Sequence, residues 1–112
     1  MESNYVRVAG TTEVPVGKMK AFKLEGKEIL IVNVNGSYYA IGNRCTHAGG
    51  DLSQGILEGN TVTCPKHHAR FDVTSGKVIS LPKVAFFHPR IKDETAYSVK
   101  VEDENITVKF QT

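Results

Sequence analysis

The sequence predicts an all-β protein, an antiparallel β-sandwich or small barrel formed by a single domain of 112 residues. Short runs of β-branched and aromatic residues are separated by turn signals, which is the pattern of strands. Apolar residues hardly ever recur at the 3.6-residue period of a helix. A chain of this length buries one hydrophobic core without disulfide staples, and no repeat, low-complexity tract or linker divides it.

Six segments have the composition of strands: near 5–8, 19–24, 28–34, 37–41, 96–101 and 105–110. The segment 19–24 alternates between apolar and polar residues, whereas 28–34 contains four consecutive apolar residues and has the pattern of a buried strand. Asn35-Gly36 is the strongest two-residue hairpin signal and joins that run to the next strand. The last two segments alternate and flank the turn 102–104, so they predict a second hairpin.

Residues 43–82 interrupt this pattern with a glycine-punctuated stretch that predicts loops rather than strands. We therefore expect a loop-rich subdomain over 43–82, inserted into a β base formed by 1–42 and 83–112.

Charge and hydropathy exclude several classes of function. A net charge of +2 is too small and too scattered to indicate binding to nucleic acid. No apolar run approaches the length of a membrane span, and 28–34 has the length of a strand, so no membrane span is expected. Residues 1–10 carry no hydrophobic signal region, which favours the cytoplasm. In that reducing compartment two cysteines are more often metal ligands or free thiols than a disulfide.

Both cysteines and three of the four histidines lie between residues 45 and 72. They form two compact pairs, Cys45-x-His47 and Cys64-x-x-His67. A disulfide between the cysteines would leave the paired histidines unexplained. Cysteine-protease chemistry would need a third, orienting group that neither pair provides.

Thiolate and imidazole are ligands that zinc and iron both prefer. Zinc fingers usually pair cysteine with cysteine and histidine with histidine, whereas here each loop supplies one of each. Two such loops facing each other could hold a two-iron cluster in which one iron takes two thiolates and the other takes two imidazoles. A structural Cys₂His₂ zinc module remains the alternative.

With these residues, the segment resembles Rieske [2Fe–2S] proteins. The first family pattern, C-x-H-x-G-x-x-L-x-x-G, is matched by Cys45, His47, Gly49, Leu52 and Gly55. The second, C-P-x-H-x-x-x-F-D-x-x-x-G, is matched by Cys64, Pro65, His67, Phe71, Asp72 and Gly76. Leu81-Pro82 stands where the family has a proline-containing loop that closes over the cluster.

The resemblance implies a Rieske fold and one Rieske-type [2Fe–2S] cluster with four ligands: Cys45, His47, Cys64 and His67. Leu52 and Pro82 would exclude water beside the cluster, and Phe71 would lie beneath the second loop. Asp72 is interpreted as a turn residue rather than a catalytic acid. No catalytic residue is expected.

Several positions depart from those of relatives. His68 follows the ligand His67 and is expected at the surface or beside the cluster, and His88 is expected in an exposed loop. High-potential Rieske proteins carry a disulfide where this chain has Gly50 and Lys66. They also carry hydroxyl groups near the sulfurs, where this chain has Ala69 and Phe71.

Fewer hydrogen bonds to the cluster predict a lower reduction potential, so the chain resembles the low-potential, ferredoxin type. Four cations partly oppose this trend: Arg44, Lys66, Arg70 and Lys77. Further along the chain, Phe86 and Phe87 are expected in the core rather than in an exposed contact patch.

A cluster with four protein ligands has no vacant position for a substrate. The resemblance therefore implies an electron-transfer protein rather than an enzyme, serving between a ferredoxin reductase and a terminal oxygenase or another acceptor. The cations near the site suggest a partner with an acidic face. A small subunit of a larger redox enzyme, of the nitrite-reductase type, is the second hypothesis. The chain has no room for a mononuclear-iron, flavin or nicotinamide domain.

Overall fold

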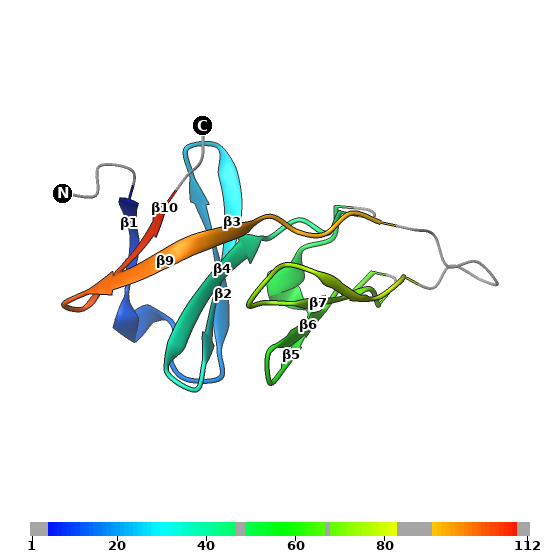
Figure 1. Cartoon of the computed structure of the whole chain (residues 1–112), viewed down its shortest axis with the longest axis horizontal. Coiled ribbons are helices and arrows are strands. Elements are labelled where there is room, and N and C mark those ends of the chain that lie inside the picture. Colours follow the sequence, from blue (N-terminus) through cyan, green and yellow to red (C-terminus); the bar gives the residue numbers. More distant parts are fainter. Residues whose placement is uncertain (1–4, 47–48, 67, 83–90, 110–112) are drawn as a thin grey trace.

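The structure is a computed structural model that describes residues 5–46, 49–66, 68–82 and 91–109. These ranges contain strands and two short 3₁₀ helices (Figure 1). In chain order the elements are β1 (Tyr5–Gly10), η1 (Thr11–Glu13), β2 (Met19–Leu24), β3 (Lys27–Val34), β4 (Ser37–Gly42), η2 (Leu52–Gln54), β5 (Ile56–Glu58), β6 (Thr61–Thr63), β7 (Arg70–Asp72), β8 (Val78–Ser80), β9 (Ala96–Glu102) and β10 (Asn105–Lys109). Neither helix is long and apolar enough to cross a membrane, a finding that covers the described ranges only.

The base of the molecule is a six-stranded antiparallel sheet in the order β1-β10-β9-β4-β3-β2. It contains the six strands expected from the sequence, so the all-β prediction is confirmed. Asn35 and Gly36 both adopt positive φ, 53° and 93°, as a tight turn between β3 and β4 requires. Residues from β1, β3, β4 and β10 meet in one buried cluster, because the sheet curls around its own core.

The inserted region holds more regular structure than the sequence predicts. Four strands of three residues each form a second antiparallel sheet in the order β5-β6-β7-β8. Val62 on β6 pairs with Phe71 on β7, and both side chains are fully buried. This sheet lies beside the base (Figure 1) and carries the second cysteine loop between β6 and β7.

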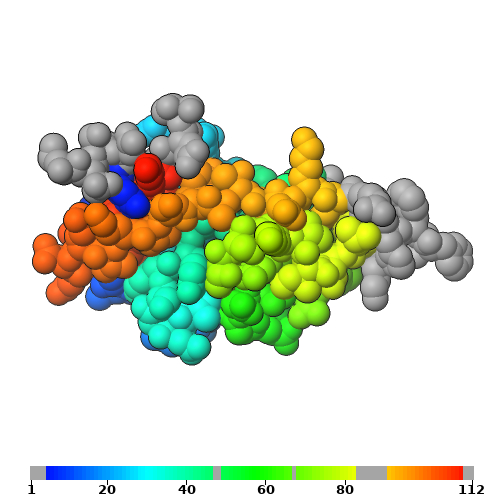
Figure 2. Space-filling model, viewed as in Figure 1, coloured from blue at the N-terminus to red at the C-terminus, as the bar shows by residue number. Residues whose placement is uncertain are grey.

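Strand β3 joins the two halves because both of its faces are buried. Ile29 and Ile31 point into the core of the base, whereas Leu30 and Val32 belong to a second core. That second core also includes Val62 and other residues of the small sheet. Full burial of side chains of this size contributes about 1.5–3 kcal/mol each. Figure 2 shows green residues of the inserted region in contact with the cyan residues of the base.

Candidate metal centre

The first cysteine loop is closed by two backbone hydrogen bonds. The Cys45 amide donates to the Gly50 carbonyl at 2.8 Å, and the Gly49 amide donates to the Cys45 carbonyl at 2.9 Å. Gly49 has a φ of 69°, the left-handed region that glycine adopts at no steric cost. The cysteine therefore lies at the start of a tight loop whose backbone groups are bonded internally.

The second cysteine loop has the same scaffold. The Cys64 amide donates to the Ala69 carbonyl at 2.7 Å, and the His68 amide donates to the Cys64 carbonyl at 3.1 Å. His68 occupies the position of Gly49 and has a φ of 65°. Its side chain is exposed, as expected from the sequence. The predicted ligands His47 and His67 lie outside the described residues.

The two loops face each other at close range. A Cβ atom placed on Gly50 would lie 2.8 Å from the Cys64 Sγ and 3.4 Å from the Lys66 Cγ, so only glycine fits here without displacing a neighbour. Both cysteines are buried, with 3% and 1% of their surface exposed, and they are not joined by a disulfide. Two buried thiols on facing loops are suitable ligands for a soft metal site.

Beneath the loops, the cysteines belong to the second core. Leu52, Ala69 and Phe71 are buried in the same cluster as Cys45 and Cys64. Pro82 is also buried, whereas Leu81 beside it is exposed. Leu52 and Phe71 are therefore buried in contact with the same core as the cysteines, which agrees with the expectation that Phe71 packs beneath the second loop.

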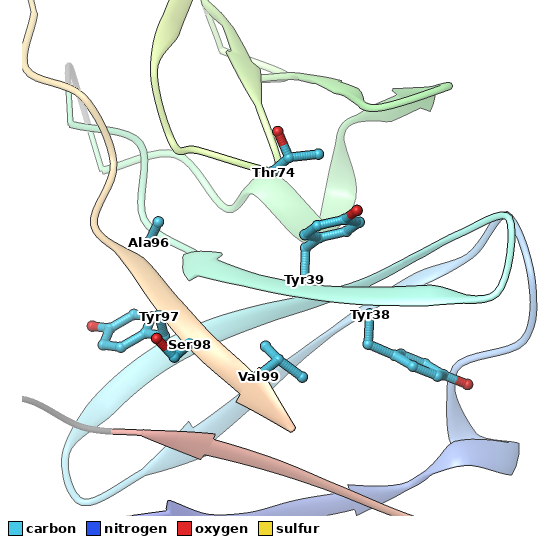
Figure 3. Close-up of a pocket in the computed structure, with 7 residues that line it drawn as sticks. All are labelled: Tyr38, Tyr39, Thr74, Ala96, Tyr97, Ser98 and Val99. Carbon is cyan, nitrogen blue, oxygen red and sulfur yellow. The ribbon is translucent and has the colours of Figure 1, made fainter. Parts of the chain in front are cut away.

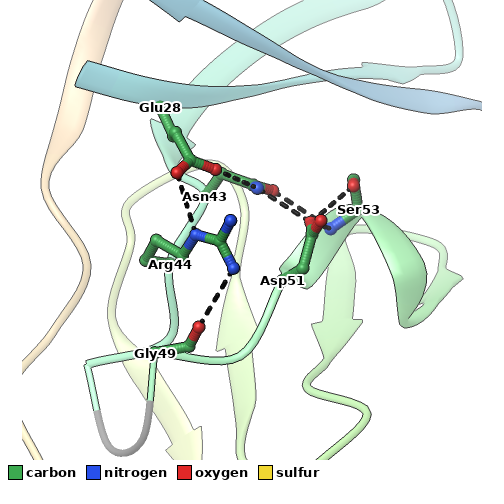
Figure 4. Close-up of polar contacts among 6 residues, drawn as sticks. All are labelled: Glu28, Asn43, Arg44, Gly49, Asp51 and Ser53. Atoms are coloured by element: carbon green, nitrogen blue, oxygen red, sulfur yellow. Dashed lines mark hydrogen bonds and ion pairs between the residues drawn. The ribbon is translucent and has the colours of Figure 1, made fainter. Parts of the chain in front are cut away.

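A polar network supports the first loop from the side of the base (Figure 4). Asn43 is fully buried; its side-chain amide donates to the Asp51 carboxylate at 2.8 Å, and its side-chain oxygen accepts from the Ser53 amide at 3.0 Å. Arg44 pairs with Glu28 at 3.0 Å and donates to the Gly49 carbonyl at 3.2 Å. These bonds connect both ends of the loop to strand β3.

Hydrogen bonds lower the pKa of both carboxyls in this network. The Arg44 guanidinium lowers the pKa of Glu28, and the Ser53 hydroxyl, followed by the Asn43 amide, lowers the pKa of Asp51. Both groups are therefore negatively charged at neutral pH. The Glu28 charge offsets that of Arg44, one of the cations counted near the site from the sequence.

A carboxylate from the far end of the chain also contacts the first loop. Glu94 is only 6% exposed and accepts a hydrogen bond from the Thr46 amide at 3.0 Å. Burial raises the pKa of this carboxyl to about 7, although the Thr46 bond opposes the shift. Sequence reasoning missed both Glu94 and Asn43, because neither belongs to the ligand pattern and neither has a local signal of burial.

Asp72 is a turn residue, as predicted. Its carboxylate accepts from the Thr74 amide at 2.8 Å and from the Thr74 hydroxyl at 2.7 Å, and its carbonyl accepts from the Gly76 amide. The expectations for Phe86, Phe87 and His88 lie outside the described residues.

A cleft of about 350 Å³ lies between the base sheet and the β7–β8 turn, and the Tyr39 side chain points toward the turn that carries Thr74 (Figure 3). Tyr38, Ala96, Tyr97, Ser98 and Val99 complete its lining. Thr74 follows β7, whereas the second cysteine loop precedes that strand, so the cleft and the cysteines lie at opposite ends of β7. Neither Cys45 nor Cys64, the candidate ligands among the described residues, lines this cleft.

The fold and the paired loops define a small all-β metalloprotein, and comparison with known proteins gives its family. The Rieske [2Fe-2S] domain family matches residues 4–90, so the chain belongs to this family. A ferredoxin component of naphthalene 1,2-dioxygenase/salicylate 5-hydroxylase systems from Ralstonia sp. is 36% identical, covering 99% of this chain and all of the relative. Membership of this family gives the cofactor of this chain as one Rieske-type [2Fe–2S] cluster.

Solved structures give the same result. The ferredoxin of carbazole 1,9a-dioxygenase from Nocardioides aromaticivorans is 33% identical, with a TM-score of 0.80 over 96% of this chain and 99% of that one. A Sphingomonas yanoikuyae ferredoxin is 27% identical, with a TM-score of 0.77 over 96% of this chain and all of that one. The predicted Rieske fold is therefore confirmed.

Proposed function

We propose that the chain is a one-electron carrier that receives electrons from a reductase and passes them to the oxygenase of a dioxygenase system. The observation that carries this proposal is the pair of facing loops, each with a buried cysteine in the same backbone scaffold. The relatives that match nearly the whole chain are named as ferredoxin components of dioxygenase systems, which supports the same role.

We propose Cys45, His47, Cys64 and His67 as the ligands, one cysteine and one histidine from each loop. The burial of both thiols and the absence of a side chain at Gly50 support a shared site between the loops. When bound, the cluster accepts and releases a single electron. Since four protein ligands leave no position for a substrate, the chain acts as a carrier rather than as an enzyme.

The surroundings of the thiols support a reduction potential at the low end of the Rieske range. Ala69 and Phe71 are buried next to Cys64 in the second core, and neither side chain has a hydroxyl group to donate to a sulfur. Fewer donors stabilise the added negative charge less. We further propose that residues 43–82 form the cluster-binding part of a single domain whose base is 1–42 and 83–112.

The proposed partners are a ferredoxin reductase and a terminal oxygenase. Lys66 is exposed beside the buried cysteines, which favours a partner with an acidic docking face, whereas Arg44 is paired with Glu28. Charges at the rim of such a contact mainly raise the association rate, so salt should slow electron transfer. We propose the cytoplasm as the compartment, because a reducing environment keeps both thiols available to iron.

The test is reconstituted electron transfer. The purified chain is mixed with a ferredoxin reductase, NADH and the terminal oxygenase of a naphthalene dioxygenase system, and product formation is followed with and without the chain. We expect product only when the chain is present, with Cys64→Ser as the inactive control. A colourless protein with stoichiometric zinc would contradict the proposal, and stable co-purification with a large catalytic chain would favour the subunit hypothesis.

A further inference from the structure

The segment that leads into β9 connects the base to the inserted region. In Figure 1 the orange chain runs from β9 past the small sheet, and Figure 2 shows its gold residues lying over both halves. On this segment Glu94 is buried, which is rare for a carboxylic acid unless its charge is compensated. The family pattern assigns no role to this position.

Two glycines from separate parts of the chain make room for Glu94. The Glu94 amide donates to the Gly76 carbonyl at 2.7 Å, and a side chain on Gly76 would collide with the Glu94 carbonyl. A Cβ atom on Gly42, at the end of β4, would lie only 2.7 Å from the Glu94 Oε1. The backbone and the carboxylate of Glu94 are therefore both held in fixed positions.

From this position the carboxylate reaches the first cysteine loop. Its Oε2 accepts the Thr46 amide at 3.0 Å, and the Thr46 hydroxyl donates to the Lys92 carbonyl at 2.6 Å. Thr46 is the residue between Cys45 and His47. Two hydrogen bonds therefore join the 92–94 segment to the point in the chain that separates the two proposed ligands of this loop.

We propose that Glu94 is a positioning residue for the cluster, which holds the first loop through Thr46 and places a buried negative charge beside it that lowers the reduction potential. The inference rests on the proposed function. Reduction adds negative charge to the site, and a buried carboxylate opposes that addition with little screening by water.

Several titratable groups on the segments around Glu94 can influence the protonation of its carboxyl. Lys92 and Asp93 precede it on its own segment, Lys77 lies next to Gly76, Cys45 lies on the loop, and Tyr97 follows on β9. The Asp93 carboxylate is engaged by the Val78 amide at 2.8 Å, and the negative charge of Glu94 helps to raise the pKa of Tyr97. With its own pKa at about 7, Glu94 is charged above neutrality and neutral below it.

The experiment compares Glu94→Gln with the wild-type protein. Glutamine keeps an oxygen that accepts the Thr46 amide but has no charge. Midpoint potentials are measured between pH 6 and pH 8.5, together with visible and electron paramagnetic resonance spectra of the same samples. Glu102→Gln is the matched control, because Glu102 is exposed at the far end of β9 and its loss changes the net charge equally.

We expect all three proteins to bind the cluster with the same spectrum. At pH 8.5 the equilibrium constant for reduction of Glu94→Gln should exceed that of the wild type about tenfold, which corresponds to about 59 mV for one electron. At pH 6 the two potentials should nearly coincide, because Glu94 is then protonated. Glu102→Gln should follow the wild type at every pH.

A second variant, Glu94→Leu, removes the acceptor for the Thr46 amide. Glu94→Leu should lose iron to a chelator several-fold faster than the wild type. Glu94→Gln keeps the acceptor and should lose iron at the wild-type rate. Equal potentials of Glu94→Gln and wild type at every pH, or wild-type iron retention by Glu94→Leu, would overturn the inference. If Glu94→Leu does not fold, the Glu94→Gln potentials decide alone. Absence of a [2Fe–2S] spectrum in the wild-type protein would instead overturn the proposed function.

Discussion

The two cysteine loops have the same backbone but different supports. In each, the cysteine amide donates to the carbonyl five residues later, and the amide four residues later returns a bond to the cysteine carbonyl. In each, the residue at that fourth position, Gly49 or His68, has positive φ. The loops therefore present their cysteines in the same local geometry, although their sequences share little beyond the cysteine and a histidine.

The supports differ in chemistry. The first loop is held by polar and charged side chains, chiefly Asn43, Arg44 and Glu94. The second lies at the end of the β6–β7 hairpin, above the buried Val62 and Phe71. The stabilisation that comes from titratable side chains and their hydrogen bonds depends on pH, whereas the stabilisation from apolar packing hardly does. We therefore expect pH and charge substitutions to act mainly through the first loop.

The largest expected effect is loss of a ligand. His67→Ala should lower the iron and sulfide content of the purified protein nearly to zero, because the cluster loses one of its four protein ligands. The neighbouring His68→Ala is the matched control and should retain a full cluster, since the His68 side chain is exposed. Metal analysis and visible absorption measure both. Loss in His68→Ala with retention in His67→Ala would reverse the ligand assignment.

The next effect concerns the polar support of the first loop. Asn43→Ala should lower the free energy of unfolding by about 2–3 kcal/mol, since it removes buried bonds to Asp51 and Ser53 and leaves their polar atoms short of partners. Urea unfolding followed by circular dichroism, at equal iron content, measures the change. Asn60→Ala, at an exposed turn, should change stability by less than about 0.5 kcal/mol. Equal effects of the two substitutions would show that the network does not support the loop.

Glu94 makes stability depend on pH in a definite direction. The pKa of Glu94 is about 7 in the folded protein and returns to the ordinary value of 4.5 on unfolding. Between pH 4.5 and pH 7 the folded state therefore binds a proton that the unfolded state has released. The contribution of Glu94 to stability is thus fully present below the unfolded pKa and is lost as pH rises through about 7, by about 3 kcal/mol. Urea midpoints of wild type and Glu94→Gln at pH 5 and pH 8 measure this: the wild type should lose more stability than the variant. Parallel losses would refute it.

The smallest effect is expected at the paired left-handed residues. A Cβ atom on Gly49 would meet no atom of the described residues within 4 Å, so we expect Gly49→Ala to cost backbone strain of about 1–2 kcal/mol. His68→Gly relieves the same strain in the second loop but adds chain entropy to the unfolded state, so the net change should stay within about 1 kcal/mol. Urea midpoints of both variants test this asymmetry. A large destabilisation by His68→Gly would reveal a structural role for the imidazole.

The strands of the base could be predicted from the sequence because local signals agree with the fold. The apolar run 28–34 has the composition of a strand buried on both faces, and β3 does lie between two cores. The Asn35-Gly36 turn fixes the register of the β3–β4 hairpin that it closes. The cysteine pairs, through their spacing and neighbouring glycines, predicted the family.

The small sheet and the polar supports could not be predicted in the same way. Strands of three residues, such as β7, are too short to show alternation, and their pairing depends on the loops between them. Glu94 lies in the charged stretch Lys92–Thr95, which is typical of a surface. It is buried because Gly42 and Gly76, distant in sequence, leave room for it. Such burial depends on tertiary contacts that no local pattern records.

The central claim is that each loop supplies one thiolate and one imidazole to the same cluster. Pulsed electron paramagnetic resonance of the reduced protein tests it most directly, because an imidazole nitrogen bound to a paramagnetic iron couples to the unpaired electron. We predict couplings from two histidine nitrogens in the wild-type protein and unchanged couplings in His68→Ala. A reduced cluster with no histidine nitrogen coupling, or with only one, would contradict the claim.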